Sequence, residues 1–335
     1  MRIHVFEFIC GGGTGGLPGP ARLAHEGDLM LSALLADLLE LPGIEVTYAR
    51  DARLAPLADA RLSAARVCWR RPGELPHAAL AREIAAADAV WPIAPETGGA
   101  LQAAAQAALD GGRILLGPHP DAIRLTASKR ATAQHLQQAG VDAVPCFGAA
   151  MPLAAIDGPW VVKPDDGAGC VDTRVFASRD QAAAALRDCG YDCVTQPWIA
   201  GEAMSLCVMA SHGRVDVLSV NRQHLRLERG ALELAAIDVN CEPVTEQLAA
   251  LAERVAAAIP GLRGFFGLDF IRSAGGPVMI EINPRLTSSY AALKAALGLN
   301  VAERVLAAVT DRPLPPANGH RGRAVRLDLS DDAGR

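Results

Sequence analysis

Two carboxylates and an amide near the end of the chain are spaced so that they could hold a metal ion. Asp269 and Glu281 lie in apolar segments on either side of a Gly-Gly-Pro turn, and Gly275 is midway between them. A hairpin centred there places the carboxylates opposite each other, which is unfavourable unless a cation lies between them. Asn283 falls on the same strand face as Glu281. These oxygens suit Mg²⁺ or Mn²⁺; alternatively, the face is a solvated hairpin surface.

Lysine is scarce in this chain, and two of its lysines lie where a phosphate could bind. Of the 32 Lys and Arg residues, only Lys129, Lys163 and Lys294 are lysine. A lysine that persists among so many arginines is expected to need its compact ammonium group. Lys163 ends a strand-like segment, and Lys129 lies early in an expected helix. Both are predicted to contact phosphate, although a solvated helical lysine is the ordinary alternative for Lys129.

A loop of small residues follows Lys163. Asp166, Gly167 and Gly169 lie in the segment 165–170, where glycines would let backbone N–H groups approach phosphate oxygens closely. The order of residues does not match a Walker loop, and the glycine run at 11–16 is not a convincing dinucleotide fingerprint. Taken alone, the loop after Lys163 could equally be an ordinary hairpin turn.

The segment Gln196, Pro197, Trp198 and Ile199 ends another strand-like run. Pro197 cannot donate to a sheet ladder, which indicates an edge or a crossing between domains. Such a crossing leaves backbone groups free to contact a planar base. A core strand is the alternative for this segment.

Arg285 lies two residues after Asn283 and could reach an oxygen of a phosphate or an acyl phosphate. Lys163 and Arg285 are therefore the candidates for stabilising charge during phosphoryl transfer. Glu96 begins an expected helix and is interpreted as a partner of the helix dipole.

Candidate substrate residues are scattered along the chain. Glu7, Gly12 and Gly13 lie where the first strand of an open α/β sheet should end, which is a usual ligand crevice. Glu7 could attract an ammonium group, cap a helix or pair with an arginine. Arg222 could bind a carboxylate or be a solvated strand end, and Tyr290 could stack on a substrate or pack in the core.

Composition narrows the class of protein. The chain has 335 residues, of which 50% are hydrophobic and 21% charged, so a disordered protein is excluded. A net charge of −5 argues against nucleic-acid binding through a basic face. We expect no signal peptide, no membrane span and no membrane partner, hence a cytoplasmic protein. The spacing of the eight cysteines favours free thiols.

The elements that must position these residues change character along the chain. Strands alternate with helices up to residue 119, which predicts a helix-covered parallel sheet. A single helix is expected over 121–140, followed by strand-like runs with short turns that favour antiparallel hairpins. The sequence thus predicts an α/β unit followed by an α+β unit, with boundaries at 1–119, 120–200 and 201–335.

In this order, Lys129, Lys163 with its loop, the 196–199 crossing, Asp269-Phe270 and Glu281-Ile-Asn283-Pro-Arg285 resemble the ATP-grasp superfamily of carboxylate–amine ligases. The resemblance covers about 120–300, and the preceding unit is similar to that superfamily's N-terminal domain.

The resemblance implies an ATP-grasp fold and assigns roles to these positions. Lys129 and Lys163 would hold ATP phosphates beneath the loop 165–170, and 196–199 would clamp adenine, with Gln196 where Glu is commoner. The metal ligands would be Asp269, Glu281 and Asn283. The acidic residue often found two positions after the hinge glycine is replaced by Ala203, so Glu202 is the candidate for the ribose.

Over the whole chain the likeness is greatest to the tyramine–glutamate ligase branch, which acts in the biosynthesis of methanofuran and methylofuran coenzymes. The segments that carry it are FEFICGGG, APETGGAL, SVNRQ and NPRLTSSY. The branch implies that ATP phosphorylates a carboxylate of glutamate and that an amine attacks the acyl phosphate. The implied protein is an enzyme that acts on small-molecule partners, with a homodimer as a candidate assembly. Alternatives are another amino-acid ligase of D-alanine–D-alanine type, a non-catalytic ATP-binding subunit or, less in keeping, a nicotinamide dehydrogenase.

Overall fold

The first part of the chain forms a parallel sheet covered by helices, as the sequence predicts. The computed structural model describes residues 1–15, 21–71, 73–211, 213–310 and 322–329. The sheet has the strand order β3-β2-β1-β4-β5 and every pair in it is parallel. Its elements are β1 (Arg2–Glu7), α1 (Ala21–Leu39), β2 (Glu45–Asp51), β3 (Arg66–Arg70), α2 (Pro76–Ala86), β4 (Ala89–Ile93), α3 (Ala100–Asp110) and β5 (Ile114–Leu115).

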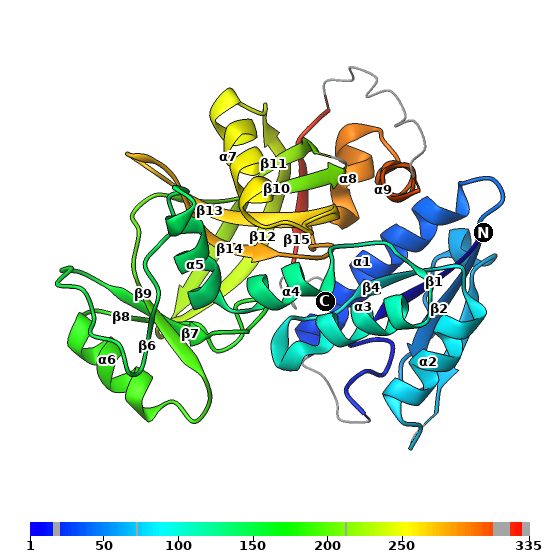
Figure 1. The fold of residues 1–335 in the computed structure, drawn as a ribbon, viewed down its shortest axis with the longest axis horizontal. Helices are drawn as coiled ribbons and strands as arrows, with labels where there is room; N and C mark the ends of the chain where they lie inside the picture. Colours follow the sequence, from blue (N-terminus) through cyan, green and yellow to red (C-terminus); the bar gives the residue numbers. More distant parts are fainter. Residues whose placement is uncertain (16–20, 72, 212, 311–321, 330–335) are drawn as a thin grey trace.

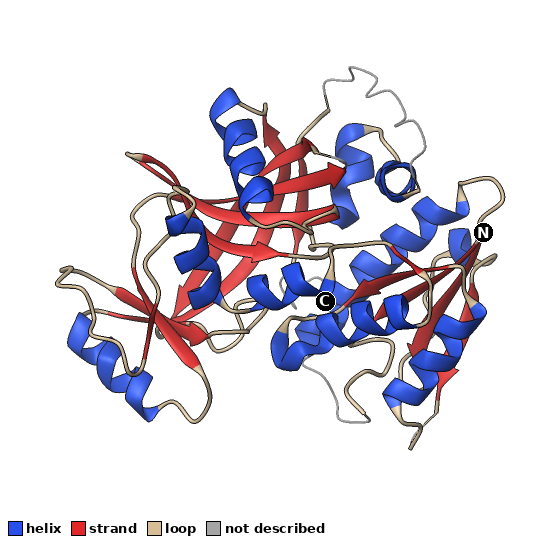
Figure 2. Ribbon diagram, viewed as in Figure 1, coloured by secondary structure: helices blue, strands red, loops and turns tan. Residues whose placement is uncertain are grey.

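The second part is a large sheet in which all pairs of named strands are antiparallel (Figure 2). Its order is β14-β13-β10-β11-β12-β8-β7-β9-β6, and β15 pairs with β12. The elements of its larger half are β10 (Glu202–Ser211), β11 (Arg214–Glu228), β12 (Ala231–Glu242), α7 (Glu246–Ala258), β13 (Gly264–Ser273), β14 (Gly276–Asn283), α8 (Tyr290–Leu297), α9 (Val301–Val309) and β15 (Val325–Asp328).

A smaller lobe, the lid, projects from this sheet at the lower left of Figure 1. It has a core of its own, in which Trp160 and Val162 of one strand pack against Ala182 and Leu186 of its helix. The lid comprises β6 (Phe147–Gly148), β7 (Trp160–Pro164), β8 (Arg174–Phe176), α6 (Arg179–Asp188) and β9 (Cys193–Pro197). Two helices precede it, α4 (Pro120–Ala127) and α5 (Lys129–Gln138).

The N-terminal domain and the larger half of the second sheet share one hydrophobic core. Leu34 and Leu38 of α1 belong to the same buried cluster as Leu293 of α8 and Val305 of α9. Polar contacts reinforce this junction, because the hydroxyl of Tyr290 donates to Asp37 at 2.8 Å. These two parts therefore form one packed body, against which the lid is a separate unit.

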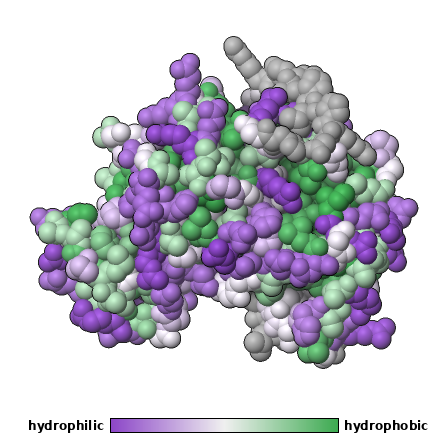
Figure 3. All heavy atoms as spheres, in the orientation of Figure 1, coloured by the Kyte–Doolittle hydropathy of each residue, from purple (hydrophilic) through white to green (hydrophobic). Residues whose placement is uncertain are grey.

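The surface alternates between polar and apolar residues and is indented between the lid and the N-terminal domain on the face shown in Figure 3. Among the helices of the described ranges, none is both long enough and apolar enough for a bilayer crossing.

Several sequence-based expectations are wrong in detail. The single helix over 121–140 is two helices, because Ser128 leaves the helical conformation and its hydroxyl accepts from the N–H of Ala131, capping α5. The strand β12 was not expected, since its Ala- and Glu-containing sequence lacks clear alternation. The expectation that all cysteines are free is also wrong, because Cys189 and Cys193 are joined by a disulfide at the end of α6.

Candidate active site

A cavity of about 260 Å³ lies where the N-terminal domain, the lid and the large sheet meet. Its walls bring together most of the residues singled out from the sequence. Those that line it are Glu7, Lys129, Lys163, Gly167, Gly169, Gln196, Pro197, Trp198, Ile199, Asp269, Glu281, Asn283 and Arg285.

The acidic pair occupies the hairpin position that its spacing predicts. Asp269 on β13 is the direct cross-strand partner of Glu281 on β14, and the connecting turn includes Gly276 with φ +118°. Both carboxylates line the cavity, as does Asn283, the cross-strand partner of Gly267. The expected hairpin is therefore confirmed, and it presents three oxygen-bearing side chains to one space.

The Asp269 carboxylate is held by two side-chain amides and is largely removed from solvent. Its two carboxylate oxygens accept from Gln223 Nε2 at 3.1 Å and from Asn283 Nδ2 at 3.0 Å. Burial, reinforced by the negative charge of Glu281, raises the pKa of Asp269 to about 7. A carboxyl group with such a raised pKa lacks sufficient positive charge close to it, which is the condition that a bound cation would relieve.

The two lysines lie on the same cavity. Lys129 Nζ donates to the carbonyl oxygen of Gly167 at 2.5 Å and lies 3.6 Å from Glu281 Oε1. Lys163 is 7% exposed and makes no hydrogen bond or ion pair with the described part of the chain. Burial lowers the pKa of Lys163. The Lys163 ammonium thus faces the cavity without a direct partner.

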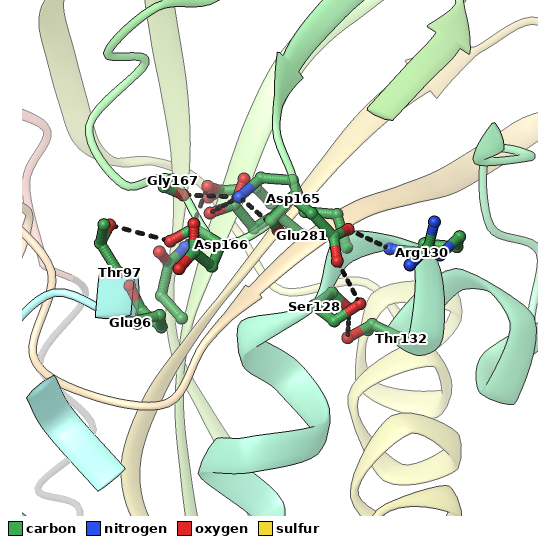
Figure 4. Close-up of polar contacts among 12 residues, drawn as sticks. Glu96, Thr97, Ser128, Arg130, Thr132, Asp165, Asp166, Gly167 and Glu281 are labelled. Carbon is green, nitrogen blue, oxygen red and sulfur yellow. Dashed lines mark hydrogen bonds and ion pairs between the residues drawn. The ribbon is translucent and has the colours of Figure 1, made fainter. Parts of the chain in front are cut away.

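Asp165, which sequence reasoning did not single out, bonds to Ser128 and Arg130, the two neighbours of Lys129 in the chain (Figure 4). Its carboxylate accepts from the Ser128 hydroxyl at 2.6 Å and from the Arg130 N–H at 2.9 Å, while its carbonyl accepts from the Lys129 N–H at 3.0 Å. The first turn of α5 is thereby fastened to the start of the loop after Lys163. The sequence does not reveal this contact, because Ser128 and Asp165 are 37 positions apart and no local motif links them.

Asp166 lies elsewhere than expected. Its carboxylate accepts from the Gly98 N–H at 2.8 Å and its carbonyl accepts from the Thr97 hydroxyl at 2.9 Å (Figure 4). It does not line the cavity, because these contacts turn it toward the N-terminal domain. The loop 165–170 is therefore tied to that domain, whereas Gly167 and Gly169 remain on the cavity wall.

The crossing from the lid to the large sheet forms another wall. The Trp198 N–H is already bonded to the carbonyl of Pro159 at 2.9 Å. Gln196 is 3% exposed, and its Nε2 finds no hydrogen-bond partner in the structure. Glu202 does not line the cavity, because it is drawn to Arg272, with a nitrogen–oxygen distance of 3.3 Å.

Arg285 does not lie free beside the acidic pair. Its Nε and Nη2 approach the two carboxylate oxygens of Glu96 at 3.0 and 3.2 Å, and Glu96 is 5% exposed. The Glu96 side chain makes no capping hydrogen bond to the start of its helix, so its expected role at the helix dipole is replaced by this interdomain ion pair. The pair fixes the end of β14 against the loop after β4.

The wall contributed by the N-terminal domain, here called the acidic wall, contains Glu7 at the end of β1 and Glu26 on α1. Glu26 accepts from the Ser288 hydroxyl at 2.6 Å and pairs with Arg22 at 3.2 Å. Glu7 accepts from the Cys10 N–H at 2.5 Å. Glu26 and Ser288 were missed, since neither carries a recognisable local motif.

The remaining candidate substrate residues do not reach the cavity. Gly12 lies against Arg70, and Gly13 lies against Phe8. Arg222 lies 3.5 Å from Glu202 on the outer part of the sheet. Tyr290 is buried in the shared core, where its hydroxyl is bonded to Asp37, so it packs rather than stacks on a ligand.

Comparison with known proteins agrees with this geometry. A family model described as an ATP-grasp domain matches residues 126–289, and a pre-ATP-grasp domain model matches residues 44–123. The chain belongs to the ATP-grasp superfamily. Members of this superfamily are ATP-dependent ligases that form carbon–nitrogen bonds, so the enzyme class expected from the sequence is confirmed. No curated protein matches the chain.

Solved structures share the ATP-grasp fold with this chain at low identity. An ATP-grasp superfamily protein from Archaeoglobus fulgidus is 21% identical with a TM-score of 0.69, covering 97% of this chain and 91% of its own. An L-amino acid ligase from Bacillus licheniformis is 18% identical with a TM-score of 0.65, covering 92% and 74%. Biotin carboxylase from Campylobacter jejuni, solved as a β,γ-ATP complex, is 18% identical with a TM-score of 0.70, covering 96% and 73%.

The ATP-grasp cavity suits a nucleotide with its metal. Among the described residues, the Lys163 ammonium and the buried Gln196 amide nitrogen have no hydrogen-bond partner, and a phosphate and a base would supply one to each. Within the described ranges no group of three or more His, Cys, Asp and Glu side chains could hold a metal. A cation bound by two carboxylates and an amide would therefore complete its coordination with water and phosphate oxygens, as Mg²⁺ commonly does.

Proposed function

We propose that the protein is a carboxylate–amine ligase that joins glutamate to tyramine or a similar amine at the expense of ATP. The observation that carries the proposal is the cavity itself. It presents two lysines and an acidic pair on one side and a second pair of carboxylates on the other. The first side suits a nucleotide phosphate with its metal, and the second suits a cationic amine.

Each group of residues has a separate proposed role in binding ATP and its metal. Lys129 and Lys163 would hold phosphate oxygens, Gln196 to Ile199 would hold the adenine, and Asp269, Glu281 and Asn283 would hold Mg²⁺. Asn283 would present its amide oxygen after a 180° rotation, which exchanges the two ends of the amide. Bound Mg²⁺ would offset negative charge on the phosphates.

In the proposed reaction an oxygen of the glutamate carboxylate attacks the γ-phosphorus of ATP, giving an acyl phosphate and ADP. The amine nitrogen then attacks the acyl carbon, and phosphate leaves as the amide forms. The chain's own contribution is positioning and charge stabilisation. Lys163 would stabilise charge most directly, because its ammonium has no direct partner among the described residues. Arg285 acts through its ion pair with Glu96, which holds the metal-bearing strand in place.

The test is product formation from a panel of amines with glutamate, ATP and Mg²⁺. We expect ADP release that depends on both glutamate and tyramine, and an amide of the matching mass. Activity with amino acids as acceptors but none with tyramine would favour a ligase of the D-alanine–D-alanine type. Nucleotide binding without turnover on any carboxylate would favour a non-catalytic ATP-binding subunit.

A further inference from the structure

Glu7 is a buried carboxylate that the fold leaves without a counter-charge. Its side chain is 3% exposed and accepts from the Cys10 N–H, and the Ile9 N–H and the Cys10 thiol also bond to it. No lysine, arginine or histidine in the described part of the chain forms an ion pair with it. An isolated buried carboxylate is costly and persists where a ligand or a function requires it.

The fold makes room for this carboxylate. Gly27 of α1 packs against Glu7 so closely that a Cβ at position 27 would lie 2.8 Å from the carboxyl carbon. The neighbouring Glu26 is bonded to Ser288, which lies three residues after Arg285. The turn of α1 that contains Glu26 and Gly27 therefore packs against Glu7 and also bonds to Ser288, in the segment that follows β14.

Other charged groups around Glu7 are already engaged. Asp28 is paired with Arg50, and the Cys10 thiol lies beside Glu7 with its pKa raised by burial. Burial likewise raises the pKa of Glu7 to about 7, although the Cys10 N–H opposes the shift. A carboxyl group with that pKa exchanges a proton readily near neutral pH.

The rest of this wall is apolar. Ile9, Leu23, Met30 and Ile93 line the cavity beside Glu7. Arg22, the nearest arginine on α1, donates to Glu26 and to the carbonyl of Leu234. A carboxylate on the incoming amine would therefore meet two glutamates and no free cation among the described residues of this wall.

We propose that Glu7 binds the ammonium group of the acceptor and takes its proton as the nitrogen attacks, and that the acceptor is a primary amine with an apolar body and no carboxylate. In this step R–NH₃⁺ transfers one proton to the Glu7 carboxylate, and the neutral nitrogen attacks the acyl carbon. The C–O bond to phosphate breaks as the amide forms, and the leaving phosphate carries away the second proton that the nitrogen loses. The proposal rests on the proposed function, because it assigns the second half of that reaction.

Hydroxylamine separates the two halves of the reaction. It is largely uncharged at neutral pH and traps an acyl phosphate as a hydroxamate without needing a base. We expect Glu7→Gln to lower kcat/KM for tyramine by about 10²–10⁴-fold at pH 7, while ADP-linked glutamyl hydroxamate formation falls less than about threefold. The wild-type rate with tyramine should rise with pH through about 7, and the variant should lose that dependence. Tyrosine should be a poor acceptor for the wild-type enzyme.

The outcomes are distinguishable. Absence of hydroxamate with the wild-type enzyme would refute the proposed function. Wild-type hydroxamate formation together with near wild-type use of tyramine by Glu7→Gln would refute the role of Glu7. If Glu7→Gln loses both activities, Glu7→Asp decides: a shared loss of both activities there indicates a structural role and overturns the proposal, while a selective loss with tyramine supports it. Glu253→Gln, on the exposed face of α7, is the matched control.

Discussion

The two sides of the cavity are built in opposite ways. On the phosphate and metal side, the three candidate metal ligands lie close in sequence on the β13–β14 hairpin, and the lysines reach them from two other segments. The acidic wall depends on contacts between distant residues, since Glu26 and Ser288 are 262 positions apart. The nearby ion pair of Glu96 with Arg285 joins residues 189 positions apart. The comparison shows that chemistry carried by one hairpin is encoded locally, whereas a surface for the second substrate exists only once the domains have packed.

The largest effect should come from substitutions on the phosphate and metal side of the cavity. Glu281→Gln or Lys163→Ala should lower turnover by at least about 10³-fold, because each removes charge opposing the transferred phosphoryl group. Urea denaturation should still show a cooperative transition, and steady-state ADP release measures the loss. A near wild-type rate in either variant would contradict the corresponding role.

A large loss of stability should come from breaking the long-range ion pair. Glu96→Ala leaves Arg285 buried without its partner and should lower the free energy of unfolding by about 3–5 kcal/mol. Replacing both residues should cost less than the sum of the two single changes. Additive losses in this double-mutant cycle, measured by urea denaturation, would mean that the two residues do not interact.

The next effect in size is the pH dependence of stability, to which one carboxyl group on each side of the cavity should contribute. The pKa of Asp269 is raised from 3.8 to about 7, so the native protein binds this proton more tightly than the unfolded chain does. Stability should therefore fall as pH rises, by roughly 2–3 kcal/mol between pH 5 and 7 from this group. Asp269→Asn should remove that part of the slope, and thermal denaturation across the range checks it. Glu7→Gln should remove a further part, and unchanged slopes would contradict both assignments.

The smallest effect should come from the contact that ties the two sides together. Thr97→Ala removes the hydrogen bond to the Asp166 carbonyl, which is worth about 0.5–1.5 kcal/mol. We expect KM for ATP to rise a few-fold with little change in kcat, because the loop 165–170 would be held less firmly. Thr97→Ser keeps the hydroxyl and should behave as wild type; equal effects in both variants would contradict the prediction.

The hairpin shows how much of the site the sequence could supply. The Gly-Gly-Pro turn supplies the hairpin, and strand periodicity of two places Glu281 and Asn283 on one face. The pairing of Asp269 with Glu281 also needs a register shift between Asp269 and Phe270, which the sequence did not reveal. The scarcity of lysine pointed to Lys129 and Lys163 for a similarly local reason. The roles of these residues in binding ATP and metal stay predictions, while the fold they belong to is established.

The residues that were missed or misplaced share a physical cause. Glu96 looked like a helix-dipole partner because its true partner, Arg285, belongs to another domain. Tyr290 could stack on a substrate or pack in the core, and α8 packs it against Phe265 in the shared core. Asp166 lay in a loop that should hold phosphate, but its neighbour across the domain boundary turned it away. Tertiary packing decides such cases, and no local pattern records it.

The separate core of the lid has a consequence for the order of events in turnover. The lid carries the loop 165–170 and the crossing at Gln196, whereas the acidic wall belongs to the larger packed body. Small cooperative units open at lower free energy than the whole molecule. We therefore expect the lid to open at a lower free energy than the packed body, once the contacts of Asp166 with Thr97 and Gly98 break. Such opening would expose the side of the cavity proposed for the nucleotide and leave the acidic wall assembled, so that nucleotide could exchange while the second substrate stays bound.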